Sequence, residues 1–374
     1  MPSPQPTQLI QQRSEFGPLL DALAGASRVA LDTEFHAERR YYPELMLVQF
    51  AFEDGSTWVV DPQSVDLSSL KEPLSSTAVI VHSGQQDIAI LWRDFEATPT
   101  DVFDVQIAAG LLGHGYPTRL GTLVQRCLNL ELSKGATLSN WAARPLSPNQ
   151  IAYAVDDVRV LFPLANLFER ELNQRNRLQW AVEASKSMAE QCQRRAPVNH
   201  NWAEWEIASQ LDATTTQIMT NLFEWRDQKG RDKNQPPMYM LSDGLALDIA
   251  RRKPQTVEAT AENRRIPQGL IRRMGHEIVA TVKKGIDNPP PLPFIPTRTE
   301  ATRAQALNLW SLVEGARLDI APKLLLPKKL ALKVAHHGPA ALDGWRSDAA
   351  GDSLASFLSG DSALRLTDDG PSLT

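Results

Sequence analysis

RVALDTEF, residues 28–35, is the stretch of the sequence that decides the fold. Apolar residues dominate it, which is typical of a β-strand that runs through a protein core. Asp32 and Glu34 are two residues apart, so their side chains point to the same face of such a strand. Two carboxylates on one face repel each other unless a cation lies between them. The stretch therefore predicts either a buried strand with part of a metal site, or an exposed edge strand with unrelated acids.

Three more short runs of β-type residues follow, namely LMLVQFAF (residues 45–52), TWVV (57–60) and AVIVH (78–82). The first two of these runs and the stretch at 28–35 are joined by tight connections, which favours an antiparallel meander. From Gln85 onward the apolar period becomes helical, as in QQDIAILWRDF and VQIAAGLLG. This order of elements predicts an α/β domain with a mixed sheet flanked by helices.

Two later positions add candidate catalytic residues. Asp87 follows the strand at 78–82 and opens a helix, where it could line an active site or simply be an acid that favours a first helical turn. Tyr153 and Asp157 are four residues apart, so the phenol and the carboxylate share one helix face. Asp156 faces elsewhere, and we interpret it as a surface acid. Taken alone, each position could also be an ordinary residue of a helix.

Longer motifs surround these acids. They are YYPELMLVQ at 41–49, HSGQQD at 82–87, FDVQIAAGLL at 103–112 and WAARPLSPNQIAYAVDD at 141–157. Together with the acids and DTEF, they resemble the DEDD exonuclease superfamily in its tyrosine-containing branch, and within it the ribonuclease D family. The resemblance covers essentially the whole chain, so we expect the fold and the chemistry of that family.

The resemblance implies a ribonuclease-H-like α/β fold and a 3′-to-5′ exoribonuclease that releases nucleoside 5′-monophosphates. It also implies two divalent ions, Mg²⁺ or Mn²⁺, whose ligands are Asp32, Glu34, Asp87 and Asp157. Asp32 would bridge the two ions, while Glu34 and Asp157 would complete the shell of one. Asp87 would help to hold the other ion, partly through water. Tyr153 would hydrogen-bond the attacking water or the scissile phosphate.

Several other residues are left out of this catalytic set. Asp104, in the motif FDVQ, is interpreted as a structural residue near the site. His36 and His82 are interpreted as ordinary hydrogen-bonded histidines. The two cysteines, Cys127 and Cys192, lack metal-ligand spacing, so a zinc site and a disulfide framework are not expected. Oxygen ligands alone suit hard cations such as Mg²⁺ and Mn²⁺.

Beyond residue 193 we expect helices and no strand. The polar stretch QRRAPVNHNW (193–202) is interpreted as a linker, and the proline-rich segment at 287–296 must be extended. The domains predicted from these breaks are residues 1–193, 205–286 and 298–374.

The two helical segments also resemble known modules. The segment 205–286 carries WRD at 225–227 and LSD at 241–243, and it resembles the HRDC domain, a helical module named after helicases and ribonuclease D. The segment 298–374 resembles a degenerate second HRDC-like module, because neither signature is present in it. Its part in RNA binding is therefore left open.

A run of basic residues within the HRDC-like segment is a candidate RNA-binding surface. Residues 251–284 contain nine lysines and arginines against three acids. Such an excess can bind phosphates, although most charge runs are only solvated helix faces. The RNA-binding residues proposed from this run are Arg264, Arg265, Arg272 and Arg273.

Bulk properties restrict the remaining alternatives. The chain has 374 residues and a formal net charge of −5, a total to which a carboxylate-rich metal site contributes. It shows no secretory signal and no apolar stretch of the ~20 residues that would cross a bilayer, and its two cysteines fit a reducing compartment, so we expect a cytoplasmic protein. We also expect a monomer. The expected partners are RNAs with single-stranded 3′ ends, such as tRNA precursors. A 3′-to-5′ exonuclease acting on DNA and a catalytically inactive RNA-binding protein are the alternatives.

Overall fold

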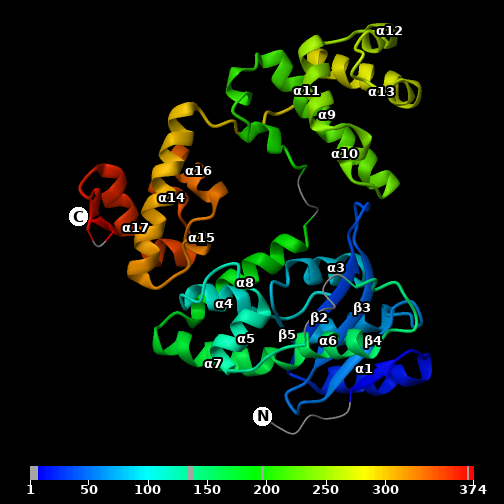
Figure 1. The fold of residues 1–374 in the computed structure, drawn as a ribbon, viewed down its shortest axis with the longest axis vertical. Helices are drawn as coiled ribbons and strands as arrows, with labels where there is room; N and C mark the ends of the chain where they lie inside the picture. The colour runs from blue at the N-terminus through cyan, green and yellow to red at the C-terminus, as the bar shows by residue number, and fades with distance from the viewer. Residues whose placement is uncertain (1–6, 134–138, 195–197, 369) are drawn as a thin grey trace. The chain divides into compact units, whose positions relative to one another are not determined.

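The computed structural model describes residues 7–133, 139–194, 198–368 and 370–374. The chain divides into two compact units (Figure 1). Unit 1 comprises Met1–His36, Leu45–Ala196 and Arg303–Thr374, and unit 2 comprises Ala37–Glu44 and Pro197–Thr302. Of the linker predicted at 193–202, residues 195–197 lie outside the described residues.

Unit 1 is built on a six-stranded mixed sheet with the order β1-β4-β3-β2-β5-β6. Its strands are β1 (Gln8–Ile10), β2 (Arg28–His36), β3 (Glu44–Ala51), β4 (Thr57–Val60), β5 (Ala78–Val81) and β6 (Val102–Asp104). β3 and β4 pair antiparallel, whereas β2 with β5 and β5 with β6 pair parallel. This confirms the predicted α/β class. β1 and β6 were not predicted, because each is only three residues long.

Helices cover both faces of this sheet (Figure 1). They are α1 (Phe16–Gly25), α2 (Lys71–Ser76), α3 (Gln85–Phe95), α4 (Val105–Leu111), α5 (Leu120–Leu128), α6 (Pro148–Arg159), α7 (Leu161–Gln174) and α8 (Leu178–Cys192). Alternate side chains of β2 pack into two different hydrophobic clusters. Ala30 packs into the cluster that also contains Phe168, whereas Val29 and Leu31 pack into the cluster that contains Phe50. α6 contacts β2 and β4, so it lies against the sheet where β2 carries its acids.

The C-terminal segment completes unit 1 and shares its core. It contains α14 (Arg298–Leu318), whose first five residues belong to unit 2, and α15 (Pro322–Leu325), α16 (Lys328–His337), α17 (Gly344–Ser359), β7 (Leu364–Thr367) and β8 (Gly370–Leu373). Trp310 and Trp345 are fully buried in the same hydrophobic cluster as Phe168 of α7. The amide of Ala321 donates to the carbonyl of Gly110 in α4 at 2.8 Å. The first and last predicted segments therefore fold as one compact unit, and the boundaries 1–193 and 298–374 stay a prediction.

The expectation that no strand follows residue 193 is wrong. β7 and β8 form an antiparallel hairpin close to the C-terminus. Four of its eight strand residues are exposed and the other four are half-buried, and the side chain of Leu366 is 87% exposed. Each strand has only four residues, and β8 opens with Gly370 and Pro371, a pair that is typical of a turn, so the sequence does not predict the hairpin.

Unit 2 is a helical module. Its helices are α9 (Ala213–Lys233), α10 (Pro237–Met240), α11 (Asp243–Arg252), α12 (Val257–Ala261) and α13 (Gln268–Asp287). Arg226 of the WRD signature donates to the carbonyl of Leu241 at 2.9 Å and to the carboxylate of Asp243 at 2.6 Å. The two signatures are therefore joined by a mostly buried ion pair that fixes the start of α11 against α9.

Short 3₁₀ helices and an extended segment lie between these elements. The 3₁₀ helices are Arg13–Glu15, Ser68–Leu70, Asn201–Glu204, Ala208–Gln210 and Pro339–Ala341. The proline-rich segment between α13 and α14 contains no helix or strand, in line with the extended conformation predicted for it. Among the described residues, none of the helices combines the length and the apolar character that crossing a bilayer requires.

Candidate metal centre

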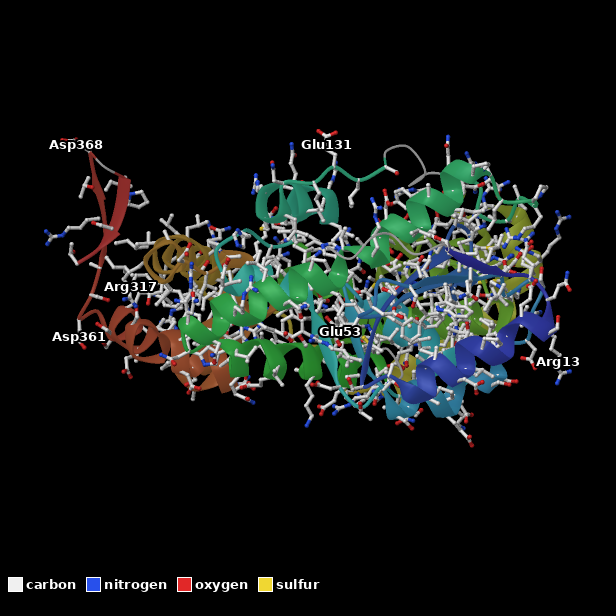
Figure 2. All side chains as sticks on the ribbon, turned by 90° about the horizontal axis from the view of Figure 1, so that it is seen from below. Arg13, Glu53, Glu131, Arg317, Asp361 and Asp368 are labelled. Carbon is white, nitrogen blue, oxygen red and sulfur yellow. The ribbon has the colours of Figure 1, made fainter. Side chains whose placement is uncertain are left out.

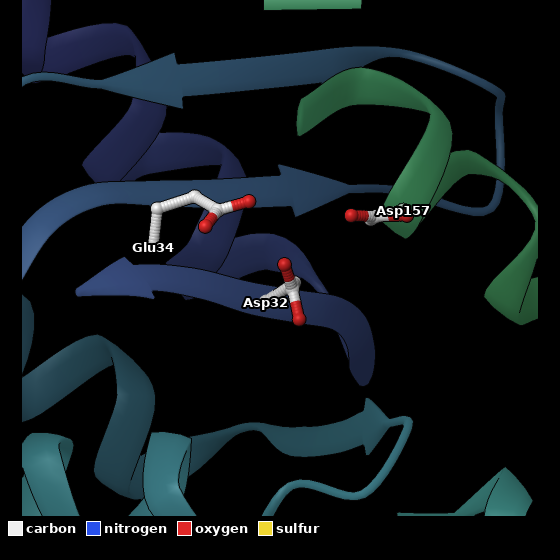
Figure 3. A group of neighbouring side chains, drawn as sticks. All are labelled: Asp32, Glu34 and Asp157. Atoms are coloured by element: carbon white, nitrogen blue, oxygen red, sulfur yellow. The ribbon is translucent and has the colours of Figure 1, made fainter. Parts of the chain in front are cut away.

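Three of the predicted ligands meet at one place in unit 1. One carboxylate oxygen each from Asp32, Glu34 and Asp157 lies within 4.8 Å of the other two. Figure 3 shows Asp32 and Glu34 on β2 and Asp157 on α6. The spacing of two along the strand accounts for the first pair, and α6 brings the third carboxylate to the same face.

Asp87 is held beside this cluster by a different element. It lies in the first turn of α3 and is 6% exposed. The hydroxyl of Thr33 donates to its Oδ1 at 2.5 Å, which ties α3 to β2 between the two strand acids. Asp87 is not within the 4.8 Å group, but its charge helps to raise the pKa values of Asp32 and Glu34. It is therefore an electrostatic neighbour of the group.

The four carboxyls disfavour one another's ionisation. Burial, followed by the charges of Asp87, Asp157 and Glu34, raises the pKa of Asp32 well above its ordinary value. Burial and the charges of Asp157 and Asp87 raise the pKa of Glu34 to about 8. Burial raises the pKa of Asp157 to about 7 and that of Asp87 to about 6. Uncompensated negative charge of this kind, presented only by oxygen atoms, suits a hard divalent cation.

The start of α6 is fixed by a capping box. Ser147 is the N-cap, and its hydroxyl accepts a bond from the amide of Gln150 at 3.3 Å. The side chain of Gln150 accepts in return from the amide of Ser147 at 3.0 Å, and Pro148 occupies the first turn. This pattern fixes the residue at which the helix begins, and therefore the position along the helix from which Asp157 faces β2.

An ion pair anchors the loop that leads into α6. Arg144 binds the carboxylate of Asp61 through two nitrogens, at 2.5 and 2.7 Å. It also donates to the carbonyl of Met46 in β3 at 3.0 Å. Asp61 is fully buried directly after β4, so the loop is tied to the sheet. Sequence reasoning did not identify this pair, since the two residues are distant in the chain.

Tyr153 and Asp156 point in different directions from α6. A hydrogen bond from Tyr153 to Asp157 opposes the rise in the pKa of Asp157, so the phenol lies next to this carboxylate. Asp156 is 5% exposed, accepts from the amide of Ser133 at 2.7 Å and pairs with Arg159 at 2.8 Å. The interpretation of Asp156 as a surface acid is wrong, because its carboxylate is buried and is bound by the amide of Ser133 and by Arg159.

Asp104 supports the turn in front of α3. Its carboxylate accepts from the amides of Ser83 and Gly84, each at 3.0 Å, and from the amide of Gln106 at 2.8 Å. Because that turn leads into the helix with Asp87, Asp104 has the structural place that its motif suggested. His82 lies close to this turn, where its Nε2 contacts the carbonyl of Thr118 at 3.0 Å and burial lowers its pKa.

The predicted RNA-binding arginines lie in unit 2. Arg264, Arg265, Arg272 and Arg273 are all exposed. Arg265 forms an ion pair with Asp248 at 2.8 Å. Arg272 and Arg273 belong to the first turns of α13. Their exposure leaves them accessible to a polyanion.

The raised pKa values predict how the stability of the metal-free protein depends on pH. A carboxyl with a higher pKa in the folded than in the unfolded chain binds protons more tightly when folded, so stability falls as pH rises. The fall should occur as pH rises through about 6, 7 and 8, the values of Asp87, Asp157 and Glu34. Thermal melts in EDTA across this range measure it.

Glu34→Gln is the control for these melts, because it removes the carboxyl with the highest of the three values while other titrating groups remain. The fall in Tm between the ends of the range should be smaller in this variant. Saturating Mg²⁺ should also reduce the fall in the wild type, since a bound cation offsets the repulsion. Identical pH profiles for the wild type and the variant in EDTA would contradict the electrostatic description.

Two family models match the chain. The model described as 3′-5′ exonuclease matches residues 7–173, and the model described as HRDC domain matches residues 215–282. The first covers the sheet of unit 1 with the carboxylate cluster, and the second covers most of the helices of unit 2.

Curated relatives and solved structures extend the match over most of the chain. Ribonuclease D of Xanthomonas oryzae pv. oryzae is 30% identical over 343 residues, which cover 88% of this chain and 93% of that protein. Ribonuclease D of Desulfotalea psychrophila is 32% identical over 276 residues, covering 70% and 72%. The crystal structure of Escherichia coli RNase D superposes with a TM-score of 0.82 at 23% identity, covering 95% of this chain and 99% of that one. This last similarity concerns the fold.

Proposed function

The chain belongs to the ribonuclease D family and is a 3′-5′ exoribonuclease, and from this premise we propose that Asp32, Glu34, Asp87, Asp157 and Tyr153 form its catalytic site. The observation that carries the proposal is the approach of three carboxylates within 4.8 Å on the sheet of the exonuclease region. Their raised pKa values support it, because such a group of acids is stabilised by bound cations.

We propose that the site takes two divalent cations, Mg²⁺ or Mn²⁺. When bound, such ions supply an activated water and stabilise the charge that develops on the leaving oxygen. Asp32, Glu34 and Asp157 would hold one position, and Asp87 with Asp32 would hold the other. Thr33 and the capped start of α6 keep these side chains in place before substrate arrives. Tyr153 would position the water or the scissile phosphate through its hydroxyl.

Tyr153→Phe tests the role of that hydroxyl. The change keeps the ring, whose centroid lies 6.1 Å from the ring centroid of Trp141, and removes only the hydroxyl group. We expect the rate on a short RNA to fall by ~10²-fold or more, the scale of one well-placed catalytic group. Asp156→Asn is the matched control on the same helix. It should lower Tm, because Asp156 is buried against Ser133 and Arg159, and leave the rate of folded protein nearly unchanged.

We propose that the natural substrates are structured RNAs with single-stranded 3′ ends, such as tRNA precursors. Two findings support this: the match of unit 2 to the HRDC domain and the exposed arginines Arg264, Arg265, Arg272 and Arg273. The Escherichia coli RNase D that shares the fold is described as an exoribonuclease involved in structured RNA processing. Action in the cytoplasm as a monomer belongs to the same proposal.

Matched RNA and DNA oligomers test the proposed activity. With Mg²⁺, the protein should shorten single-stranded RNA from its 3′ end and release nucleoside 5′-monophosphates, which chromatography of the products identifies. A 3′-terminal phosphate should inhibit, because its charge crowds a site that accepts a free hydroxyl. Shortening from the 5′ end, or cuts within a circular RNA, would refute the exonuclease assignment. Faster degradation of the DNA oligomer would favour a DNA exonuclease instead.

A further inference from the structure

Charge in the C-terminal segment of unit 1 is divided between two stretches. Residues 320–342 contain four lysines and no acid, whereas residues 343–369 contain six aspartates and two arginines. The lysines lie in α15 and α16, and the five aspartates that the structure describes lie between Asp343, the N-cap of α17, and Asp368, directly after β7. Figure 2 shows two of the aspartates, Asp361 and Asp368, beside the strands of this hairpin. The segment therefore presents one basic part and one acidic part.

α16 turns its basic side chains outward. The side chains that it buries in the core of unit 1 are those of Ala331, Leu332, Val334 and Ala335. Lys329 and Lys333 are one turn apart, and His336 and His337 continue the same exposed face. Lys328 is also exposed in the first turn. No carboxylate of the described residues forms an ion pair with Lys329 or Lys333. Within the described part of the chain, the charges of Lys329 and Lys333 are therefore not neutralised by an ion pair.

α16 is attached firmly to the part of the chain that carries the carboxylate cluster. Ala321, just before α15, donates its amide to Gly110 of α4 at 2.8 Å. The packing there is close: a Cβ on Gly110 would lie 2.7 Å from a methyl group of Leu324. Arg177 adds a bond to the carbonyl of Leu318 at 2.6 Å. The lysines of α16 thus belong to the same compact unit as the carboxylates, whereas the arginines of the HRDC-like module belong to unit 2.

We propose that the α16 lysines, Lys328, Lys329 and Lys333, bind backbone phosphates of the RNA body while its 3′ end occupies the carboxylate cluster. The inference rests on the proposed action on structured RNA. An RNA is favoured over a protein partner because the exposed face carries cations and few apolar side chains, while the substrate of the family is a polyanion. A contact on unit 1 would hold the RNA at a fixed position relative to the site, independently of unit 2.

The test uses the full-length triple variant Lys328→Gln, Lys329→Gln and Lys333→Gln. Binding of a stem-loop RNA with a single-stranded 3′ tail is measured by fluorescence anisotropy in EDTA over a series of salt concentrations. Each lost phosphate contact lowers the slope of log affinity against log salt by roughly 0.7 to 0.9, so the slope should fall by about two. A matched control removes three exposed charges elsewhere in unit 1, through Arg13→Gln, Arg170→Gln and Lys186→Gln. It should change the slope little.

Two further measurements separate the outcomes. The charge-conserving variant with arginine at the three lysine positions should restore the wild-type slope, which excludes misfolding as the cause. Degradation of the tail RNA alone, in Mg²⁺, should be equal in the triple variant and the wild type. If the wild type fails to degrade the tail, the proposed function fails. If the wild type degrades the tail but the triple variant and the matched control have the same salt slope, the proposed role of the α16 lysines is refuted and the proposed function is not. An altered oligomeric state with unchanged RNA affinity would show a protein contact and overturn the proposal.

Discussion

Asp32→Asn should lower the rate of RNA degradation by at least about 10³-fold, the upper range for one preorganised electrostatic group. Asp32 is the carboxyl whose pKa is affected by all three of the other acids, so it lies where their fields overlap. Removing its charge should weaken the binding of any cation held between β2 and α6. Binding of RNA in EDTA should survive, since the basic surfaces are unchanged.

The same variant should gain stability without metal. Asparagine keeps the shape of the side chain and removes a charge that repels Asp87, Asp157 and Glu34. At a pH above the raised values, Tm in EDTA should therefore be higher than that of the wild type, while the increase in Tm on adding Mg²⁺ should be smaller. Loss of activity with a lower Tm in EDTA would indicate misfolding. Full activity in Mg²⁺ would refute the role of Asp32 in metal binding.

Ending the chain after Thr302 should unfold unit 1. The truncation removes α14 from Arg303 onward together with α15 to α17, and it exposes the part of the core that packs against Trp310, Trp345 and Leu325. At about 25 cal/mol per Å², exposing on the order of 200 Å² of apolar surface costs about 5 kcal/mol, comparable with the lower end of a typical folding free energy. The carbonyl of Gly110 also loses the amide of Ala321.

Circular dichroism melts and degradation of a short RNA measure the effect. The truncated chain should aggregate or melt at a much lower temperature, and its activity should fall with the folded fraction. The matched control ends the chain after Gly360, which removes the hairpin of β7 and β8, none of whose strand residues is fully buried, and keeps the helices. That control should remain folded and active. A chain ending at Thr302 with the Tm and activity of the full-length protein would show that the segments are independent domains.

The central part of the fold could be predicted because its strands are apolar runs that end at charged or turn-forming residues. β2, β3, β4 and β5 lie within a residue or two of the runs that predicted them. β1 and β6 are too short to show a period, and β7 and β8 have only four residues each, with the turn-forming pair Gly370 and Pro371 at the start of β8. The common core of α7 with α14 depends on contacts between residues more than a hundred positions apart, and local patterns carry no information about such contacts.

The candidate site shows the same division between local and distant information. Spacing alone placed Asp32 with Glu34 on one strand face, and Tyr153 with Asp157 on one helix face. Spacing also showed that Asp156 points away from Asp157. It could not show that the amide of Ser133 donates a hydrogen bond to the carboxylate of Asp156. Thr33, which holds Asp87 in place, has no sequence signal apart from its position between two acids.

The most direct test of the metal centre is anomalous scattering from crystals of the wild-type protein soaked in Mn²⁺. We expect an anomalous difference peak within coordination distance of the carboxylates of Asp32, Glu34 and Asp157, and a second, closely spaced peak on the side of Asp87. Crystals of Asp32→Asn treated in the same way should show neither peak at comparable height. Strong Mn²⁺ peaks elsewhere on the protein, with none between β2 and α6, would contradict the assignment of this cluster as the catalytic metal site.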